Sequence, residues 1–315
     1  MNETTQTART APTAPLLQLE DVVVRYKDGH GKLFTVLNDI DFKVSPGEFV
    51  TVVGPSGCGK STLLRMILGS ETPMQGTVHF EGKRVTSPDR NRGIVFQRYS
   101  VFPHYTVLMN LMFGLEVEHF GMVTRNLWPF EFKRKRREFK EKALFYLKRV
   151  GLEGHEDKYP HQLSGGMRQR VAIAQSLIMK PKILLMDEPF GALDYSTRQD
   201  MQLFILEQWK ETDMTVFFVT HDLEEAVYLG TRAIILTQYY TTDAPQNEGS
   251  KIATDIPLPG PHPKPSAFKF SKEMGELVEK LRKDGLEPQH SRHIRDFDLR
   301  HKDSWRTVSP EEWRR

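Results

Sequence analysis

The chain has 315 residues and a formal net charge of only +3, with 44 basic and 41 acidic side chains. This length is enough for one large α/β domain with an appendage, and the near-balanced charge does not favour nucleic acid as a partner. No run of about 20 apolar residues occurs, so we expect no membrane-spanning helix. Cys58 is the only cysteine, which excludes an intramolecular disulfide.

The first segment, residues 1–15, is rich in Thr, Ala, Gln and Pro and has no apolar core. We therefore expect a disordered leader and not a secretion signal. The main domain is predicted to span residues 16–245. It begins with an antiparallel β region, in which Tyr26 follows the stretch Leu19–Arg25.

A phosphate-binding loop is predicted between a strand and a helix. Phe49–Val53 is an apolar, β-branched strand, and a helical apolar stripe runs up to Gly69. The loop between them matches the pattern Gly-x-x-x-x-Gly-Lys-Ser. It comprises Gly54, Pro55, Ser56, Gly57, Cys58, Gly59, Lys60, Ser61 and Thr62. Its N–H groups would bind phosphate at a helix N-terminus, Lys60 would add a charge at the outer phosphates, and Ser61 a hydroxyl for Mg²⁺.

The thiol of Cys58 lies within this loop, close to a helix N-terminus and to Lys60. Both neighbours favour the thiolate form. We therefore expect alkylation of Cys58 to inhibit ATP hydrolysis, and bound ATP to protect the thiol.

Residues 98–165 are predicted to form a mostly helical insertion. Within it, the basic run Lys133–Arg137 follows Trp128 and Phe130. Two interpretations remain open: a solvated helix face, or a surface that contacts anionic lipid headgroups or an acidic patch.

A second anion-binding segment closes this insertion. It consists of Ser164, Gly165, Gly166 and Met167. Ser164 and the two glycines predict a second nest of N–H groups, at the start of a helix expected over residues 166–179. Such a nest would bind a second anion, or the far side of the anion that the phosphate-binding loop holds.

Two adjacent carboxylates follow the next predicted strand, residues 183–187. Asp187 ends this strand and can hold Mg²⁺, and Glu188 beside it can polarise a water for attack on a γ-phosphate. Further elements alternate between helix and strand, at residues 196–211, 215–220, 222–229 and 233–237. This alternation predicts a largely parallel sheet. Residues after four of its strands, Gly54, Gln97, Asp187 and His221, should then meet at one edge.

Together these motifs resemble the ATP-binding subunits of ABC transporters over about residues 16–240. Leu163–Gln169 is similar to their signature sequence, and only Met167 departs from it. The resemblance implies an α/β P-loop ATPase, the ABC nucleotide-binding domain, with an antiparallel β subdomain, a helical subdomain over residues 98–165 and a C-terminal extension. It also implies ATP and Mg²⁺ as cofactors.

The resemblance further implies roles for single residues. Tyr26 would stack on adenine, Gln97 would sense Mg²⁺ and the attacking water, and His221 would contact the γ-phosphate, although Tyr26 could instead pack at a strand end. Asp194 would lie in the loop that crosses a dimer interface. The resemblance then gives the catalytic residues as Glu188, His221, Lys60 and Gln97. It gives the metal ligands as Ser61, Gln97 and Asp187.

The same resemblance implies a head-to-tail dimer of two copies, in which Ser164–Gly166 of one copy closes over the ATP of the other. The dimer would sit at the cytoplasmic face of the inner membrane, bound to permease subunits and indirectly to a solute-binding protein. Phe102, Pro103 and Tyr105 are candidate contacts for the permease; local packing is the alternative. The sequence Thr220–Ala226 and the sequences around Ser164 and Asp187 resemble those in the ATP-binding subunits of importers of nitrate, sulfonate, taurine or bicarbonate. Some relatives of these importers are associated with urea or guanidinium-type compounds.

Two other functions remain open. One is an ABC subunit that drives export or lipid movement. The other is a soluble ATPase of DNA repair or chromosome organisation. The latter class carries long coiled-coil insertions, whereas the segment between Gln97 and Ser164 is short and has no sustained heptads.

The final segment, residues 246–315, is predicted as a C-terminal extension. Lys251–Leu258 has the pattern of a last strand, and Ser271–Asp284 has a helical pattern that ends at Gly285. Trp305 and Trp313 are candidate docking anchors. A regulatory or dimer-stabilising tail and a peripheral wrap without such a role are both consistent with this sequence.

Overall fold

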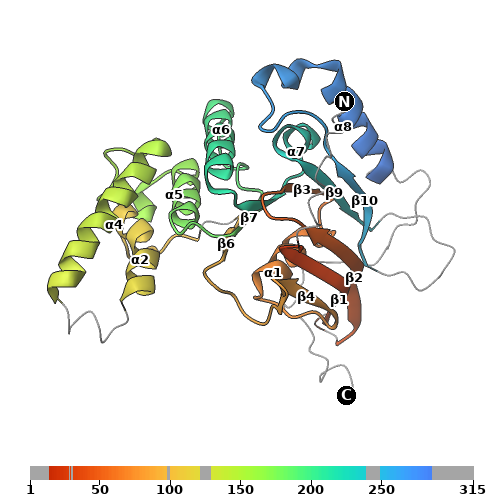
Figure 1. Ribbon diagram of the computed structural model, residues 1–315, viewed down its shortest axis with the longest axis horizontal. Coiled ribbons are helices and arrows are strands. Elements are labelled where there is room, and N and C mark those ends of the chain that lie inside the picture. Colours follow the sequence, from red (N-terminus) through yellow and green to blue (C-terminus); the bar gives the residue numbers. More distant parts are fainter. Residues whose placement is uncertain are drawn as a thin grey trace, which may run out of the picture.

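The computed structural model of the protein describes residues 14–27, 29, 31–97, 100–120, 129–238 and 249–285. These residues form two sheets and a separate group of helices, which appear as neighbouring parts in Figure 1. The architecture is the predicted α/β nucleotide-binding fold. Among the described residues, no helix is both long and apolar enough to cross a bilayer.

The first sheet has four antiparallel strands in the order β2-β1-β4-β5. Its strands are β1 (Leu17–Lys27), β2 (Leu33–Val44), β4 (Gln75–Phe80) and the short β5 (Lys83–Arg84). Apolar residues from β1, β2 and β4 pack against helix α1 (Lys60–Leu68) in one core. The antiparallel β region predicted at the start of the domain is therefore present.

The central sheet has the strand order β10-β9-β3-β8-β7-β6, and all its neighbours run parallel except β10 and β9. Its strands are β3 (Phe49–Val53), β6 (Arg92–Val95), β7 (Ile183–Asp187), β8 (Thr215–Val219), β9 (Arg232–Thr237) and β10 (Lys251–Pro257). Every residue of β3, β7 and β8 is buried, because both faces of a parallel sheet are covered. Consecutive side chains accordingly enter different cores: Phe217 lies with α1 and Phe218 with the helices on the opposite face.

Three helices connect strands of this sheet: α5 (Gly165–Leu177), α6 (Tyr195–Thr212) and α7 (Leu223–Leu229). Their ends lie within two residues of the predicted bounds. Each begins with a side-chain cap, from Ser164, Asp194 or Asp222, that accepts a backbone N–H of the first turn. Such caps satisfy donors that a helix leaves unpaired, so the sequence itself fixes where these helices start.

The segment predicted as a helical insertion contains α2 (Val107–His119), α4 (Pro129–Arg149) and the short η1 (Pro160–Gln162); its bounds as a subdomain, residues 98–165, stay a prediction. Residues 98, 99 and 121–128, with Trp128, lie outside the described part. Figure 1 shows α2, α4 and α5 together at one end of the molecule. Apolar residues of α2 and α4 belong to the same continuous core as residues of β7 and β8.

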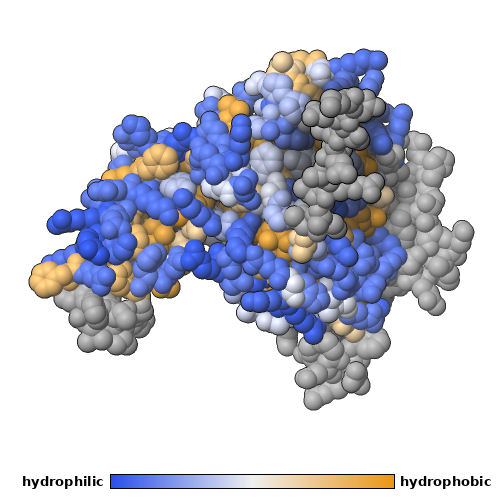
Figure 2. Space-filling view, in the orientation of Figure 1, coloured by the Kyte–Doolittle hydropathy of each residue, from blue (hydrophilic) through white to orange (hydrophobic). Residues whose placement is uncertain are grey.

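The basic run Lys133–Arg137 forms part of α4, where Phe130 is 88% exposed. Three cations of the run are paired: Arg136 Nε donates to Glu116 Oε1 at 2.9 Å, Lys135 Nζ donates to Glu138 Oε2 at 2.8 Å, and Arg134 lies 3.9 Å from Glu131. Figure 2 shows this end of the molecule as mostly hydrophilic with separate apolar patches. Both interpretations of the run, a solvated face or contact with anionic lipid headgroups or an acidic patch, remain predictions.

The C-terminal segment is packed onto the main domain. The predicted last strand is β10, which pairs antiparallel with β9 as an edge of the central sheet. The predicted helix is α8 (Lys272–Gly285), which follows η2 (Ser266–Phe270) and packs against α7. The expected docking anchors Trp305 and Trp313 and the leader up to residue 13 lie outside the described residues.

Candidate functional site

The phosphate loop joins β3 to α1 through backbone geometry that requires glycine. Gly59 has φ 90°, in the left-handed region that glycine adopts without penalty. A Cβ atom on Gly54 would lie 2.0 Å from the carbonyl oxygen of Leu236 in β9. The loop therefore sits against the neighbouring strand too closely for a side chain at this position.

The ammonium group of Lys60 folds back over this loop. Its Nζ donates to the carbonyl oxygens of Gly54 at 2.8 Å and Pro55 at 2.9 Å, and the side chain is only 7% exposed. These two carbonyls stabilise a nearly buried cation. An entering phosphate would offer the cation a stronger, charge-assisted partner at the same place.

Cys58 differs from the expectation of a reactive thiolate. The residue is fully buried, and this burial raises the pKa of its thiol, although Lys60 nearby opposes the shift. Its Sγ lies 3.9 Å from Lys60 Nζ, so the predicted cation is present, but desolvation outweighs it. The prediction of favoured thiolate character is therefore wrong.

The two carboxylates follow β7, beside the loop. Asp187 is 8% exposed, and burial raises its pKa, while a hydrogen bond from Ser61 acts in the opposite direction. This pairing brings together two of the three predicted metal ligands. Glu188 has φ 45°, a strained value for a non-glycine residue, and its N–H donates to Val219 O at 3.0 Å. Both adjacent side chains nevertheless line one cavity beside the loop.

Glu188 lies between the two other predicted catalytic side chains. Gln97 Nε2 donates to Glu188 Oε2 at 3.0 Å, and His221 Nδ1 is 3.7 Å from Glu188 Oε1. These residues follow β6, β7 and β8, which are adjacent in the sheet. The predicted convergence of strand ends is therefore observed for this group, and 72% of the His221 side chain is exposed.

A cavity of about 350 Å³ connects the loop and the carboxylates. Its lining residues are Ser56, Gly57, Gly59, Lys60, Ser61, Thr62, Arg65, Gln97, Asp187 and Glu188. Of these, Arg65 was not predicted. It lies four residues after Ser61 on α1, one turn along the same face, so helical spacing from Ser61 could have indicated it. The lining combines backbone N–H donors, two cations and two carboxylates, which is the chemistry needed to bind a polyphosphate and a hard cation.

Tyr26 is placed differently from the expectation of an aromatic ring exposed to adenine. The residue is fully buried, its hydroxyl donates to Glu71 Oε2 at 2.7 Å, and its ring packs 6.1 Å from that of Phe34. Burial, with the Glu71 charge, raises the pKa of the hydroxyl strongly. Stacking on adenine would require the ring to leave this position, so the structure corrects the expected exposure.

The signature segment lies elsewhere in the fold. Ser164 caps α5 by accepting the N–H of Met167 at 3.2 Å, and it is exposed. Asp194 similarly caps α6, accepting from Thr197 N at 3.0 Å, which lowers the pKa of its carboxyl. None of the residues from Ser164 to Met167, nor Asp194, lines the 350 Å³ cavity. One chain therefore does not bring the two predicted anion-binding segments into one cavity.

The candidate permease contacts take part in local packing. The ring of Phe102 lies 5.7 Å from that of Tyr105 and 4.9 Å from that of Phe113. The buried side chain of Asn110 accepts the N–H of Phe102 at 2.7 Å. Pro103 is exposed beside them. The structure thus shows the packing alternative, and a role in partner contact stays a prediction.

Comparison with known proteins places this site in a family. A family profile described as ABC transporter matches residues 37–191. The uncharacterized ABC transporter ATP-binding protein MJ0412 of Methanocaldococcus jannaschii is 49% identical over 208 residues, which cover 66% of this chain and 73% of that protein. The chain belongs to the ABC transporter family. As an ABC ATP-binding protein, it is an ATPase coupled to transport.

Other relatives of this ABC ATP-binding protein carry more specific names. The nitrate import ATP-binding protein NrtD of Synechocystis sp. is 40% identical, over 77% of this chain and 87% of that protein. The aliphatic sulfonates import ATP-binding protein SsuB of Bacillus cereus is also 40% identical, over 69% and 80%. The solved ATP-binding cassette MJ0796, described as a dimer bound to ADP and Pi, has a TM-score of 0.65 and 31% identity, over 78% of this chain and 99% of that one.

Proposed function

We propose that this ABC ATP-binding protein drives import of a small polar solute by closing two copies of itself around MgATP. The observation that carries the proposal is the position of Glu188, beside the phosphate loop and between Gln97 and His221. A carboxylate held there is suited to accept a proton from a water that attacks the terminal phosphate. Gln97 would orient that water, and His221 would hold the phosphate.

The phosphate loop would bind the triphosphate. Backbone N–H groups from Gly54 to Thr62 would contact its oxygens, and Lys60 would exchange its two carbonyl partners for phosphate. Ser61, Gln97 and Asp187 would hold Mg²⁺, for which hydroxyl, amide and carboxylate oxygens are suitable ligands. When bound, that ion would neutralise charge on the outer phosphates.

A second copy would complete the site. The N-terminus of α5 is exposed, carries the Ser164–Gly166 nest and does not line the cavity of its own chain. In a head-to-tail pair, this nest would contact the ATP bound by the partner, and Asp194 would lie near the boundary. The relative described as a dimer with ADP and Pi supports this arrangement. Hydrolysis would then remove the anion that joins the two copies and favour opening.

The nature of the cargo is proposed from the relatives' names. They are ATP-binding proteins of nitrate and of aliphatic sulfonate import, which favours a small anionic or polar solute and favours import over export. The pair would act at the cytoplasmic face of the membrane, attached to permease subunits. A solute-binding protein would act through the permease, without touching this chain.

Reconstitution tests this function. The chain would be combined with its permease in proteoliposomes, and uptake of nitrate, taurine, alkyl sulfonates, bicarbonate and urea measured with and without MgATP. We expect ATP-dependent uptake of one solute class and none with Lys60→Met, which removes the phosphate-binding ammonium. Export of solute on ATP addition, or ATP hydrolysis unaffected by Lys60→Met, would contradict the proposal.

A further inference from the structure

A chain of polar side chains begins at the residue before His221. Thr220 follows β8, and its hydroxyl donates to Glu225 Oε2 at 2.7 Å. The same hydroxyl oxygen accepts the N–H of Asp222 at 3.1 Å. The backbone on both sides of His221 is therefore tied, through one hydroxyl, to the carboxylate of Glu225 in α7.

The carboxylate of Glu225 is nearly enclosed. The residue is 9% exposed, and its second oxygen accepts from Gln202 Nε2 of α6 at 2.9 Å. Burial raises the pKa of this carboxyl, whereas the bonds from Thr220 and Gln202 lower it. A buried carboxylate is stable only when its hydrogen bonds are made and a cation compensates its charge.

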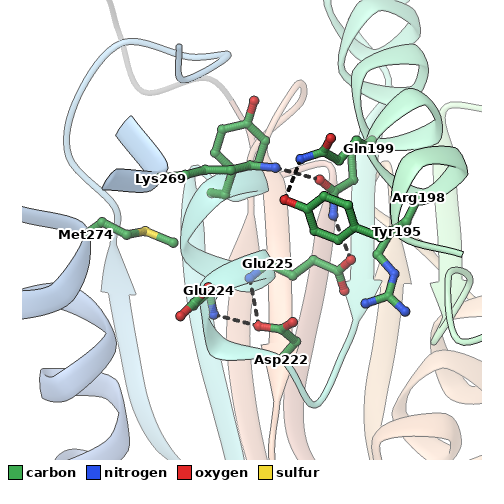
Figure 3. A pocket seen from close by; sticks show the side chains of 10 residues that line it. Tyr195, Arg198, Gln199, Asp222, Glu224, Glu225, Lys269 and Met274 are labelled. Carbon is green, nitrogen blue, oxygen red and sulfur yellow. Dashed lines mark hydrogen bonds between the residues drawn. The ribbon is translucent and has the colours of Figure 1, made fainter. Parts of the chain in front are cut away.

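Two cations act on this carboxylate: Arg198 of α6 and, from the C-terminal segment, Lys269. Lys269 Nζ, in η2, donates to Gln202 Oε1 at 3.1 Å and lies 4.1 Å from the centre of the Tyr228 ring. Figure 3 shows Lys269 reaching from this segment toward α6, with Glu225 pointing from α7 and Met274 of α8 at the side. These side chains line a cavity of about 110 Å³. Other charged groups around it are Arg198, Asp222 and Glu224.

The hydrogen bonds that link these side chains all run toward the carboxylate of Glu225. The ammonium of Lys269 donates to the Gln202 carbonyl, the Gln202 amide donates to Glu225, and the Thr220 hydroxyl donates to Glu225 from the other side. Removing the ammonium would leave the Gln202 carbonyl oxygen without its donor and Glu225 with Arg198 as the remaining cation beside this cavity. Linked polar networks of this kind respond as a unit when one member is lost.

We propose that Lys269 and Glu225 are positioning residues for His221, and that the C-terminal segment thereby controls the catalytic loop after β8. The inference rests on the proposed role of His221 in ATP hydrolysis. Docking of η2 and α8 holds Thr220 in place, and Thr220 fixes the backbone from which His221 faces Glu188. Release of this docking would misplace His221 without touching the phosphate loop, so that turnover changes while ATP affinity does not.

The test uses the full-length protein and steady-state ATP hydrolysis. Lys269→Met should lower kcat about tenfold and leave KM within about twofold, because the loss is in positioning and not in nucleotide binding. Lys269→Arg should restore most of the activity, since a guanidinium can donate to the Gln202 carbonyl and stack on Tyr228. Hydrogen exchange of the peptide spanning residues 220–226 should be faster in Lys269→Met.

The matched control is Lys272→Met, which removes a cation of α8 whose side chain is 91% exposed. It should leave kcat, KM and exchange unchanged. Lys269→Met that behaves like this control would overturn the inference. The inference would also be overturned if, in the double variant, the kcat loss of Lys269→Met added fully to that of His221→Ala, because the effects of residues that act through one another are non-additive. If His221→Ala itself keeps the wild-type kcat, the proposed role of His221 fails; if His221→Ala is impaired but Lys269→Met is not, only the inference fails.

Discussion

Two helix N-termini in this molecule bear the sequence pattern of an anion site, but only that of α1 lines the 350 Å³ cavity. At α1, Lys60 is nearly buried and Asp187 and Glu188 line the adjoining cavity. At α5, Ser164 is exposed and caps its own helix, and the segment Ser164–Met167 lines no part of that cavity. This difference motivates the proposed dimer, in which the α5 nest of one copy would complete the α1 site of the other.

The largest expected effect comes from a substitution in the site at the N-terminus of α1. Glu188→Gln removes the proposed proton acceptor but keeps an acceptor oxygen for Gln97, so ATP binding should persist while kcat falls about 10²–10³-fold. Steady-state hydrolysis and nucleotide binding by calorimetry would measure both. Glu153→Gln is the control, since the side chain of Glu153 is 70% exposed. Near-normal turnover by Glu188→Gln would show that another group accepts the proton.

The role of the exposed segment at the N-terminus of α5 is tested by substituting two helix-capping residues. Ser164→Ala and Thr106→Ala each remove a hydroxyl that accepts a first-turn N–H, at α5 and at α2. Both should cost about 1 kcal/mol of unfolding free energy. Only Ser164→Ala should also lower kcat, by about tenfold, because only that hydroxyl would meet the partner's ATP. Equal kcat values in the two variants, with equal stability losses, would reduce Ser164 to a structural cap.

The same contrast predicts opposite pH dependences for two aspartates. Burial raises the pKa of Asp187, so stability linked to it is present below the unfolded pKa of about 3.9 and is lost as pH rises through the folded pKa. Capping bonds from Thr197 lower the pKa of Asp194, so its contribution is present above about pH 3.9 and is lost as pH falls through the folded pKa.

Denaturant unfolding between pH 3 and pH 7 checks this pair. Asp187→Asn should raise the unfolding free energy of the nucleotide-free protein at neutral pH, although it removes a proposed metal ligand. Asp194→Ala should lower the unfolding free energy at neutral pH and lose that effect in acid. Destabilisation by Asp187→Asn at neutral pH would contradict the burial argument.

The smallest expected effect concerns Cys58. Since its thiol is buried and has a raised pKa, alkylation should be slow, and MgATP should change its rate by less than about twofold. Mass spectrometry after timed exposure to iodoacetamide would measure the rate. Fast labelling that MgATP prevents would restore the original expectation of a reactive thiolate in the loop.

The sequence was sufficient where one local signal dominates. Phe49–Val53 and Ile183–Asp187 are short, mostly apolar runs, and both are strands of the central sheet with the predicted bounds. Because these strands are parallel, the position of Glu188 near the phosphate loop follows from the strand ends alone. The three helix starts were similarly marked by Ser164, Asp194 and Asp222.

Contacts between distant segments were not predictable in this way. The hydroxyl of the buried Tyr26 donates to Glu71, 45 residues further along the chain, and no local sequence pattern pairs these two residues. The thiol of Cys58 was misjudged because its charged neighbour is visible in the sequence, whereas its burial is not. The link from Lys269 to Glu225 requires the C-terminal segment to fold back on α6 and α7, which sequence spacing does not encode.

The central claim, that ATP joins the α1 site of one copy to the α5 nest of another, is tested most directly by sedimentation of Glu188→Gln with and without MgATP. The chain has a mass of 36.4 kDa. We expect this mass without nucleotide, twice this mass with MgATP, and no doubling when Ser164→Arg is added, because the long cation would block the nest. A mass that stays at 36.4 kDa in MgATP, or a dimer that tolerates Ser164→Arg, would contradict the account.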